Sequence, residues 1–115
     1  MITLDSRDLD RRLRIERPIA DDDDDGAGSG TWSPIATVWA SVMDGLPSRG
    51  EQGGTATMLI RPARVRMRYR EDVDATMRFV DGDRVLVITS GPATLGRRAG
   101  VEFMTAEFLP AGNGA

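Results

Sequence analysis

A row of arginines at every second position is the clearest chemical pattern in this 115-residue chain. The row consists of Arg64, Arg66, Arg68 and Arg70, which alternate with Ala63, Val65, Met67 and Tyr69. This alternation predicts a strand over residues 58–70 with guanidinium groups on one face. Neighbouring groups would lie about 6.6 Å apart and could bind DNA phosphates or carboxylates of other subunits. The row could equally be a solvated strand face, balanced across the sheet by Glu102 and Glu107.

Acidic side chains form two clusters. The run Asp21–Asp25 offers oxygen ligands for a divalent cation, but it lacks the alternating spacing and the final glutamate of an EF-hand loop. It is therefore expected to be a solvated loop. Glu71, Asp72 and Asp74 could imitate the carboxylate pair of a hydrolase. Nothing near them supplies a base of tuned pKa, a metal or a phosphate-binding loop, so the sequence predicts no enzyme, no catalytic residue, no metal site and no cofactor.

The composition narrows the possible chemistry further. There is no Cys and no His, and all fifteen basic residues are arginines. Disulfides, Cys- or His-based metal sites and the commonest general base are therefore excluded. The net charge of −3 comes from Asp21–Asp25, since the rest of the chain has thirteen acids against fifteen arginines. Trp32 and Trp39 could stack on bases, but in a chain so poor in aromatics they are expected to be core or interface anchors.

Short apolar segments bounded by turn residues predict a mainly β protein. Strands are expected over 12–16, 32–43, 58–70, 77–80, 84–89 and 101–109, with a hairpin turn around Asp81-Gly82. The run Val85–Ile88 is expected to be covered on both sides. The length predicts a single domain over 1–115, organised as a small antiparallel β-barrel over about 10–109 with little helix.

The connecting segments are predicted from glycine, proline and charge. Mobile loops are expected at about 20–31 and 44–57, a turn at 91–100 and a disordered tail at 110–115. The N-terminus is too charged for a signal peptide, and no segment has the roughly 20 apolar residues of a membrane span. We therefore expect a protein without a membrane partner, located inside the cell or carried in a particle assembled there.

The order of several short motifs resembles the phage head-tail joining family of head-closure or stopper adaptors. The motifs are LRIER at 13–17, Thr31-Trp32, Val38-Trp39-Ala40, Arg49-Gly50-Glu51, VRMRYR at 65–70 and FVDGDRVLVI at 79–88. The resemblance covers roughly residues 10 to 109. It implies a small β-barrel with a long protruding loop. It also implies that copies of the protein form a ring beneath the portal, between head and tail and around the DNA channel.

The resemblance also implies a structural virion protein located at the head-tail interface, after assembly in the host cytoplasm. Portal-side ring proteins, tail-terminator or tail proteins and further copies of the chain are the expected partners, and direct DNA contact is left open. The expected interface residues are Arg49, Glu51, Arg64, Arg66, Arg68 and Arg70. The alternative function is that of a small monomeric β-barrel that binds nucleic acid. Ring assembly or steeply salt-dependent DNA binding by a monomer would separate the two.

Overall fold

The strands of this protein build a closed antiparallel barrel. The computed structural model describes residues 4–19, 30–52 and 56–110. These residues contain seven strands and no helix: β1 (Arg11–Pro18), β2 (Trp32–Asp44), β3 (Ser48–Gln52), β4 (Ala56–Arg68), β5 (Arg78–Asp81), β6 (Arg84–Leu95) and β7 (Gly100–Pro110). The mainly β prediction is therefore confirmed. Since no helix is present in these ranges, none could span a membrane.

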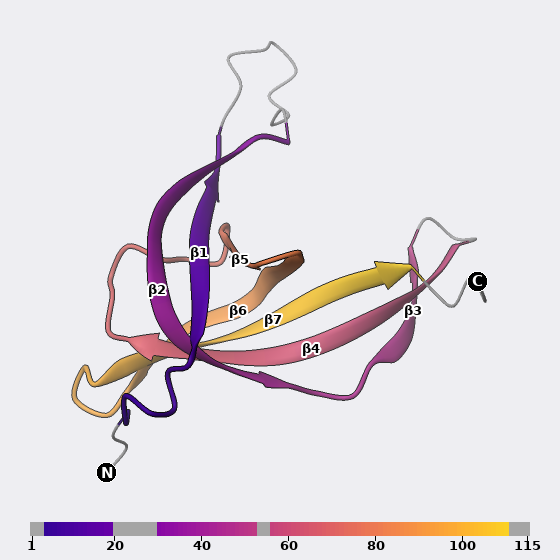
Figure 1. Ribbon diagram of the computed structural model, residues 1–115. Helices are drawn as coiled ribbons and strands as arrows, with labels where there is room; N and C mark the ends of the chain where they lie inside the picture. Colours follow the sequence, from indigo (N-terminus) through magenta and orange to yellow (C-terminus); the bar gives the residue numbers. More distant parts are fainter. Residues whose placement is uncertain (1–3, 20–29, 53–55, 111–115) are drawn as a thin grey trace.

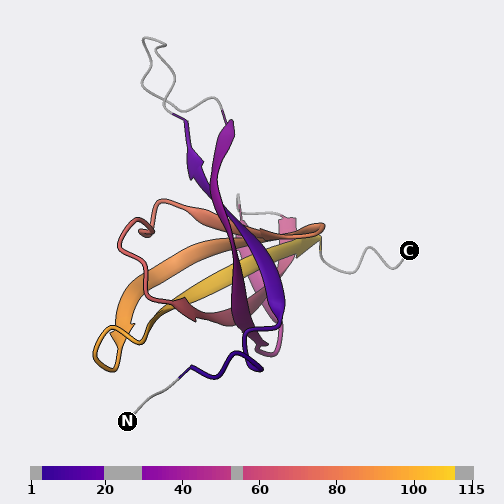
Figure 2. The same ribbon diagram turned by 60° about the vertical axis from the view of Figure 1, so that its left-hand side comes forward.

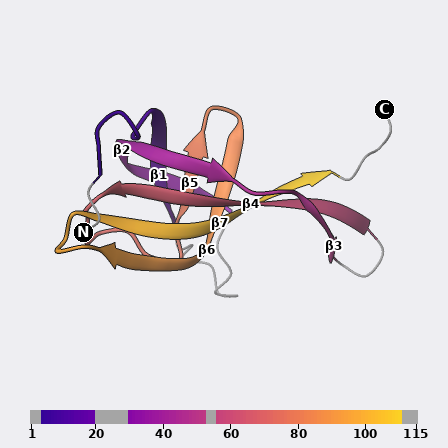
Figure 3. The same ribbon diagram turned by 90° about the horizontal axis from the view of Figure 1, so that it is seen from below.

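The barrel closes because β2 pairs with two strands along different parts of its length. Six strands follow one another in the order β2-β1-β5-β6-β7-β4, and the pairing of β2 with β4 completes the circle. Strand β3 adds to the free side of β4 outside the barrel. The far parts of β1 and β2 project beyond the barrel as a two-stranded arm (Figures 1 and 2). From below, β2, β4, β7 and β6 lie side by side (Figure 3).

The core is formed by the inward positions of the alternating strands. Along β4, Ala63, Val65 and Met67 are buried, whereas Arg64 and Arg68 are exposed. This is the alternation expected from the sequence. The aromatic rings of Phe79 and Phe103 meet edge to face in the centre, with centroids 5.3 Å apart. The apolar side chains that surround them include Leu13, Ile15, Ala40, Leu86, Ile88 and Val101.

Two connecting segments contain more strand than glycine and proline indicated. The segment 44–57, expected to be a loop, contains all of β3, whose residues Ser48–Gln52 pair with the beginning of β4. The segment 91–100, expected to be a turn, continues β6 as far as Leu95. Irregular register between Ile88 and Ala93 accommodates Gly91, which has a φ of 116°. Tertiary pairing thus outweighed the local turn signals.

Three smaller expectations also need correction. Strand β4 ends at Arg68, so Arg70 lies outside it, and Pro110 belongs to β7 and not to the tail. Val85 and Val87 are only half-buried, because β6 has one face in the core and the other outside. The Asp81-Gly82 hairpin is confirmed, and Gly82 has the positive φ of 62° that such a turn favours. The run Asp21–Asp25 and residues 111–115 lie outside the described residues.

Candidate functional site

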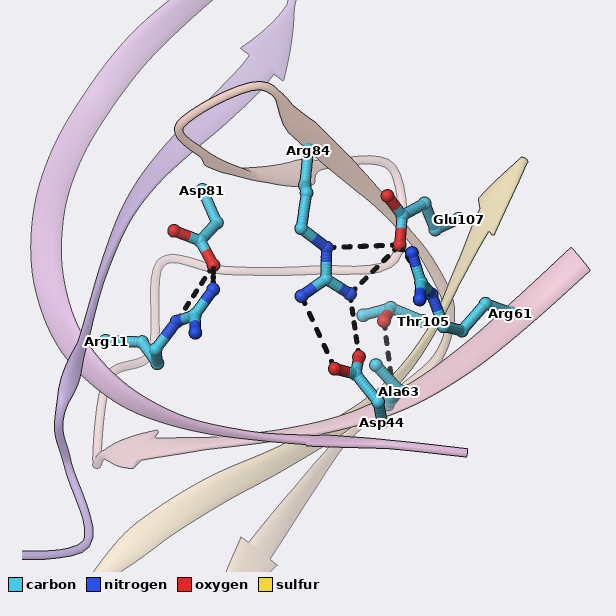
Figure 4. A network of polar contacts seen from close by, with 8 residues as sticks. All are labelled: Arg11, Asp44, Arg61, Ala63, Asp81, Arg84, Thr105 and Glu107. Carbon is cyan, nitrogen blue, oxygen red and sulfur yellow. Dashed lines mark hydrogen bonds and ion pairs between the residues drawn. The ribbon is translucent and has the colours of Figure 1, made fainter. Parts of the chain in front are cut away.

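At one end of the barrel, charged side chains point inward and contact one another (Figure 4). Glu107 of β7, only 5% exposed, accepts hydrogen bonds at Oε1 from Arg61 Nε at 3.1 Å and from Arg84 Nη2 at 2.9 Å. The same Arg84 nitrogen donates to Asp44 Oδ1 at 2.7 Å. Hydrogen bonds to Asp44 and then Glu107 raise the pKa of Arg84 above its ordinary value. We call these four residues, together with the ion pair Arg11–Asp81, the closed end.

The alternation of the strands explains why these charges meet. Arg61, Arg84 and Glu107 stand at inward positions, in step with the buried residues Ala63, Leu86 and Thr105. The Thr105 hydroxyl donates to the Ala63 carbonyl oxygen at 3.0 Å, just inside the charged layer. No buried side-chain nitrogen or oxygen in the described ranges lacks a hydrogen-bond partner. Paired charges therefore fill the space where the core would otherwise meet water.

The outward arginine row is balanced from within the molecule. Arg66 Nε lies 2.6 Å from Glu102 Oε1 on the neighbouring strand β7, and Arg64 Nε lies 3.8 Å from the same oxygen. The prediction that Glu102 counters the row is thus confirmed. Glu107, the other expected partner, pairs with Arg61, which precedes the row and faces inward. The balance by Glu102 lowers the positive charge that this face offers to DNA phosphates.

The remaining predicted interface residues are not brought into one row. Arg68 is exposed and, among the described residues, donates a hydrogen bond to the carbonyl oxygen of Leu4 alone, at 3.3 Å. Arg70 turns to Asp72, with nitrogen–oxygen distances of 2.8 and 3.0 Å, and these hydrogen bonds lower the pKa of Asp72. Arg49 is exposed on β3, and the backbone of Glu51 lies on the same strand. Their pairing register places them opposite the beginning of β4, away from Arg64–Arg68.

The other end of the barrel has an open cleft of about 580 Å³. We call it the Trp39 cleft; its lining includes Leu9, Val38, Trp39, Met67, Arg68 and Tyr69. Trp39 is 51% exposed, with the Arg12 guanidinium 5.0 Å from its ring centroid. Trp32 is half-buried under the Arg78 guanidinium, at 4.2 Å. Neither tryptophan therefore belongs to the buried core.

The side chains of the acidic trio Glu71, Asp72 and Asp74 each pair with a residue of their own segment. Glu71 accepts a hydrogen bond from the Tyr69 hydroxyl at 3.0 Å, which raises the pKa of Tyr69. Asp72 binds Arg70, as described above, and Asp74 accepts bonds from Thr76, which lower the pKa of Asp74. Each carboxylate thus stabilises the chain between β4 and β5 locally. Among the residues that the structure describes, no three acidic side chains are grouped as metal ligands.

The sequence reasoning missed both the closed end and the Trp39 cleft. Asp44, Arg61 and Arg84 come from three different strands, and no local pattern connects them. The only available signal was that Arg61 and Glu107 stand in phase with buried positions of their strands. The cleft requires the N-terminal segment, β2 and the end of β4 together. These three segments meet only because the barrel closes.

The described residues thus form a closed β-barrel with internally paired charges and with exposed apolar side chains at its surface. Residues 4–107 match the phage head completion protein family, and the chain belongs to this family. It is accordingly a structural protein of the virion head, located in the virion among other head and tail proteins. The family resemblance inferred from the order of motifs is thereby confirmed.

Two solved structures share the fold. A chain in the virion of a native gene transfer agent particle matches with a TM-score of 0.77 and 24% identity, over 90% of this chain and 97% of that one. The solution structure of protein SF1141 from Shigella flexneri 2a matches with a TM-score of 0.62 and 25% identity, over 86% of this chain and 92% of that one. No curated protein matches the chain.

Proposed function

We propose that this protein is a non-enzymatic adaptor that forms a ring between the portal and the tail, around the DNA channel. Family membership supports a role in completing the head. In this role, side faces of the barrel contact further copies, and the two ring surfaces meet portal-side proteins and tail-terminator or tail proteins. Arg49, Glu51, Arg64, Arg66, Arg68 and Arg70 are the proposed contact residues. DNA passes through the ring.

The observation that carries this proposal is a mixed row across the outward face of β2, β4 and β7. Register places Met43, Arg64 and Met104 side by side there, and Met43 is 61% exposed. Arg66 and Glu102 form the next row. Apolar side chains beside paired charges are typical of a surface that another protein covers. A surface for DNA phosphates would instead carry unbalanced cations.

The decisive experiment replaces Arg66 and Arg68 together by Gln and images the protein with its portal by electron microscopy. Ring or portal association should fail, because a partner carboxylate at this face would be left unpaired. The subunit itself should stay folded, because Glu102 retains its ion pair with Arg64. Arg68 forms no ion pair in the described part of the chain, so its replacement removes none. Arg17→Gln with Arg97→Gln is the matched control, because it removes the same charge from exposed positions elsewhere.

The alternative function makes the opposite prediction for the same variant. If the barrel binds DNA as a monomer, neither the parent nor the Arg66/Arg68 variant should form rings, and the salt slope of DNA binding should fall by about two units in the variant. Rings that form equally well with the parent and with both double variants would contradict a contact role for this face.

A further inference from the structure

We propose that Leu46 of one copy inserts into the Trp39 cleft of the next copy, so that neighbouring subunits contact head to tail. This inference rests on the proposed ring and names the two surfaces that would build it. The described residues contain a protruding apolar side chain and an apolar cleft at different places on the barrel. Such a pair makes a heterologous contact, which generates a ring when successive rotations close.

The side chain of Leu46 protrudes from the surface, and we call it the knob. It is 88% exposed, in the short connection between β2 and β3. The connection is held in place because the Gly45 amide donates to the Pro62 carbonyl oxygen at 2.7 Å. A Cβ at Gly45 would come within 2.9 Å of the Pro62 ring, so backbone and ring are closely packed. Pro47 restricts the backbone of the residue that precedes it, which is Leu46. An apolar side chain held out in this way loses little conformational entropy when it is covered.

The Trp39 cleft has the size and lining to receive such a knob. Its volume of about 580 Å³ lies within the roughly 300–1,000 Å³ typical of sites that enclose a small ligand. The half-buried Val38 provides an aliphatic contact above the buried Leu9 and Met67, and the half-exposed Trp39 provides an aromatic one. Large aromatic side chains in a recess are the usual anchors of protein interfaces. The chemistry of the cleft therefore fits a leucine on a turn.

Charge complementarity favours the same pairing. At the cleft, Arg68 forms no ion pair with a described residue, and Asp5, held by Arg7, acts on it only at longer range. Near the knob, Asp83 is exposed in the turn next to Arg84 and likewise has no ion pair among the described residues. Arg84 contacts Asp44, two residues before Leu46. The cleft thus has a cation without an ion pair, and the part of the barrel linked to the knob through Arg84 and Asp44 has a similarly placed anion, which favours contact between the two regions.

The knob cannot reach the cleft of its own molecule. The connection that carries Leu46 packs on Pro62 in the middle of β4, whereas the cleft is lined by residues 67–70, at and just beyond the end of β4. Met67, the lining residue of β4 nearest to Pro62, lies five residues further along the extended strand, a distance of about 16–17 Å. The occupant must therefore come from another molecule, and the proposed partner is a second copy of this chain.

The absence of cysteine allows a direct test by disulfide trapping. Ser6→Cys places a thiol at the rim of the cleft, and Ser48→Cys places one two residues after Leu46; both serines are exposed and nearly isosteric with cysteine. The two single variants are mixed in the full-length protein and oxidised. Ser90→Cys, at an exposed position on β6, replaces Ser48→Cys in the matched control. The 6–48 disulfide should exceed the 6–90 disulfide by about tenfold, because contact raises the effective concentration of the thiols.

A second variant assigns the trapping to the knob. Adding Leu46→Ser to the Ser48→Cys chain should reduce the 6–48 yield to the level of the control pair, while the thermal midpoint stays that of the parent. Equal yields for 6–48 and 6–90, trapping that survives Leu46→Ser, or a predominance of 6–6 and 48–48 pairs would each overturn the proposal. In assembled particles, a Ser6→Cys disulfide to another virion protein would overturn it as well.

The outcomes also separate this inference from the proposed function. Rings that form normally with Leu46→Ser leave the adaptor role intact and refute only the contact between knob and cleft. A parent chain that forms no ring, alone or with its portal, refutes the adaptor role itself.

Discussion

The two ends of the barrel handle charge and apolar surface in opposite ways. At the closed end, the carboxylates of Glu107 and Asp44 are shared among arginines from β4 and β6, and the charged layer seals the core. At the other end, Trp39 is half-exposed beside a cleft, and Arg68 donates a hydrogen bond to a backbone carbonyl oxygen and forms no ion pair with a described residue. The closed end satisfies its groups within one molecule. The cleft end leaves Trp39 half-exposed and Arg68 without an ion pair in the described part of the chain, and in our proposal a neighbouring copy covers both.

This difference separates residues that hold the fold from residues available for assembly. Both ends are rich in arginine, so residue type alone does not distinguish them. Burial of the partner distinguishes them. Removing the cations that pair with a nearly buried carboxylate such as Glu107 lowers the free energy of unfolding by several kcal/mol. An exposed arginine without a carboxylate partner contributes little to the subunit and is free to contact a neighbour. The same substitution at the two ends should therefore have unequal effects.

Arg84→Gln should have the largest effect on stability. The change removes the cation that Glu107 and Asp44 share, and only Arg61 remains beside the buried Glu107 carboxylate. We expect a loss of about 2 kcal/mol, or about 10 °C in the thermal midpoint, measured by calorimetry. Arg84→Lys keeps the positive charge but lacks the planar guanidinium group, so it should recover part of the lost stability. An unchanged midpoint for Arg84→Gln would show that the closed end does not stabilise the barrel.

Acidification should have an intermediate effect through Glu16 of β1, which pairs with Arg78 of β5. Burial raises the pKa of this carboxyl, but hydrogen bonds from Arg14 at 2.7 Å and Arg78 at 2.8 Å outweigh it, and the net pKa is lowered. Below its ordinary pKa of 4.5, the unfolded chain binds a proton that the folded chain resists. The stability that Glu16 contributes should therefore be present at neutral pH and lost as the pH falls through the lowered folded value.

Denaturant unfolding at pH 6 and at pH 3.5 measures this contribution. Glu16→Gln should reduce the difference between the two pH values, because one titrating carboxylate is absent. Asp83→Asn is the matched control, since Asp83 is exposed and has no ion pair in the described ranges. If both variants show the same acid dependence as the parent, the ion pairs of Glu16 do not contribute to it.

Arg68→Gln should have the smallest effect on stability and sharpens the comparison with Arg84→Gln. The exposed side chain gives up one hydrogen bond of 3.3 Å to the Leu4 carbonyl oxygen, so the free energy of unfolding should change by less than about 0.5 kcal/mol. A normal melting curve together with weakened self-association would confirm that the cleft end serves assembly. A loss of stability as large as that of Arg84→Gln would remove the distinction between the ends.

Most strands could be predicted because their alternation is local. Residues 32–43 and 101–109 were expected as strands and lie within β2 and β7. The prediction failed where turn-forming residues stand inside a ladder, as in β3 and the second half of β6. Gly91 is tolerated there because the register shifts around it, and Ser48–Gln52 form a strand because the beginning of β4 offers a free edge. Neither circumstance is visible in the local sequence.

The sequence by itself determined the β-class, the inward row Ala63–Val65–Met67, the outward arginines and the family, because each depends on period-two spacing or on the order of short motifs. It also excluded every chemistry that needs Cys or His. Only the tertiary structure decided which arginines are balanced. Barrel closure brings Asp44, Arg84 and Glu107 together from three strands and leaves Arg68 beside the Trp39 cleft. Ion pairing depends on distances between strands, and these are set by closure and register, which one-dimensional spacing does not contain.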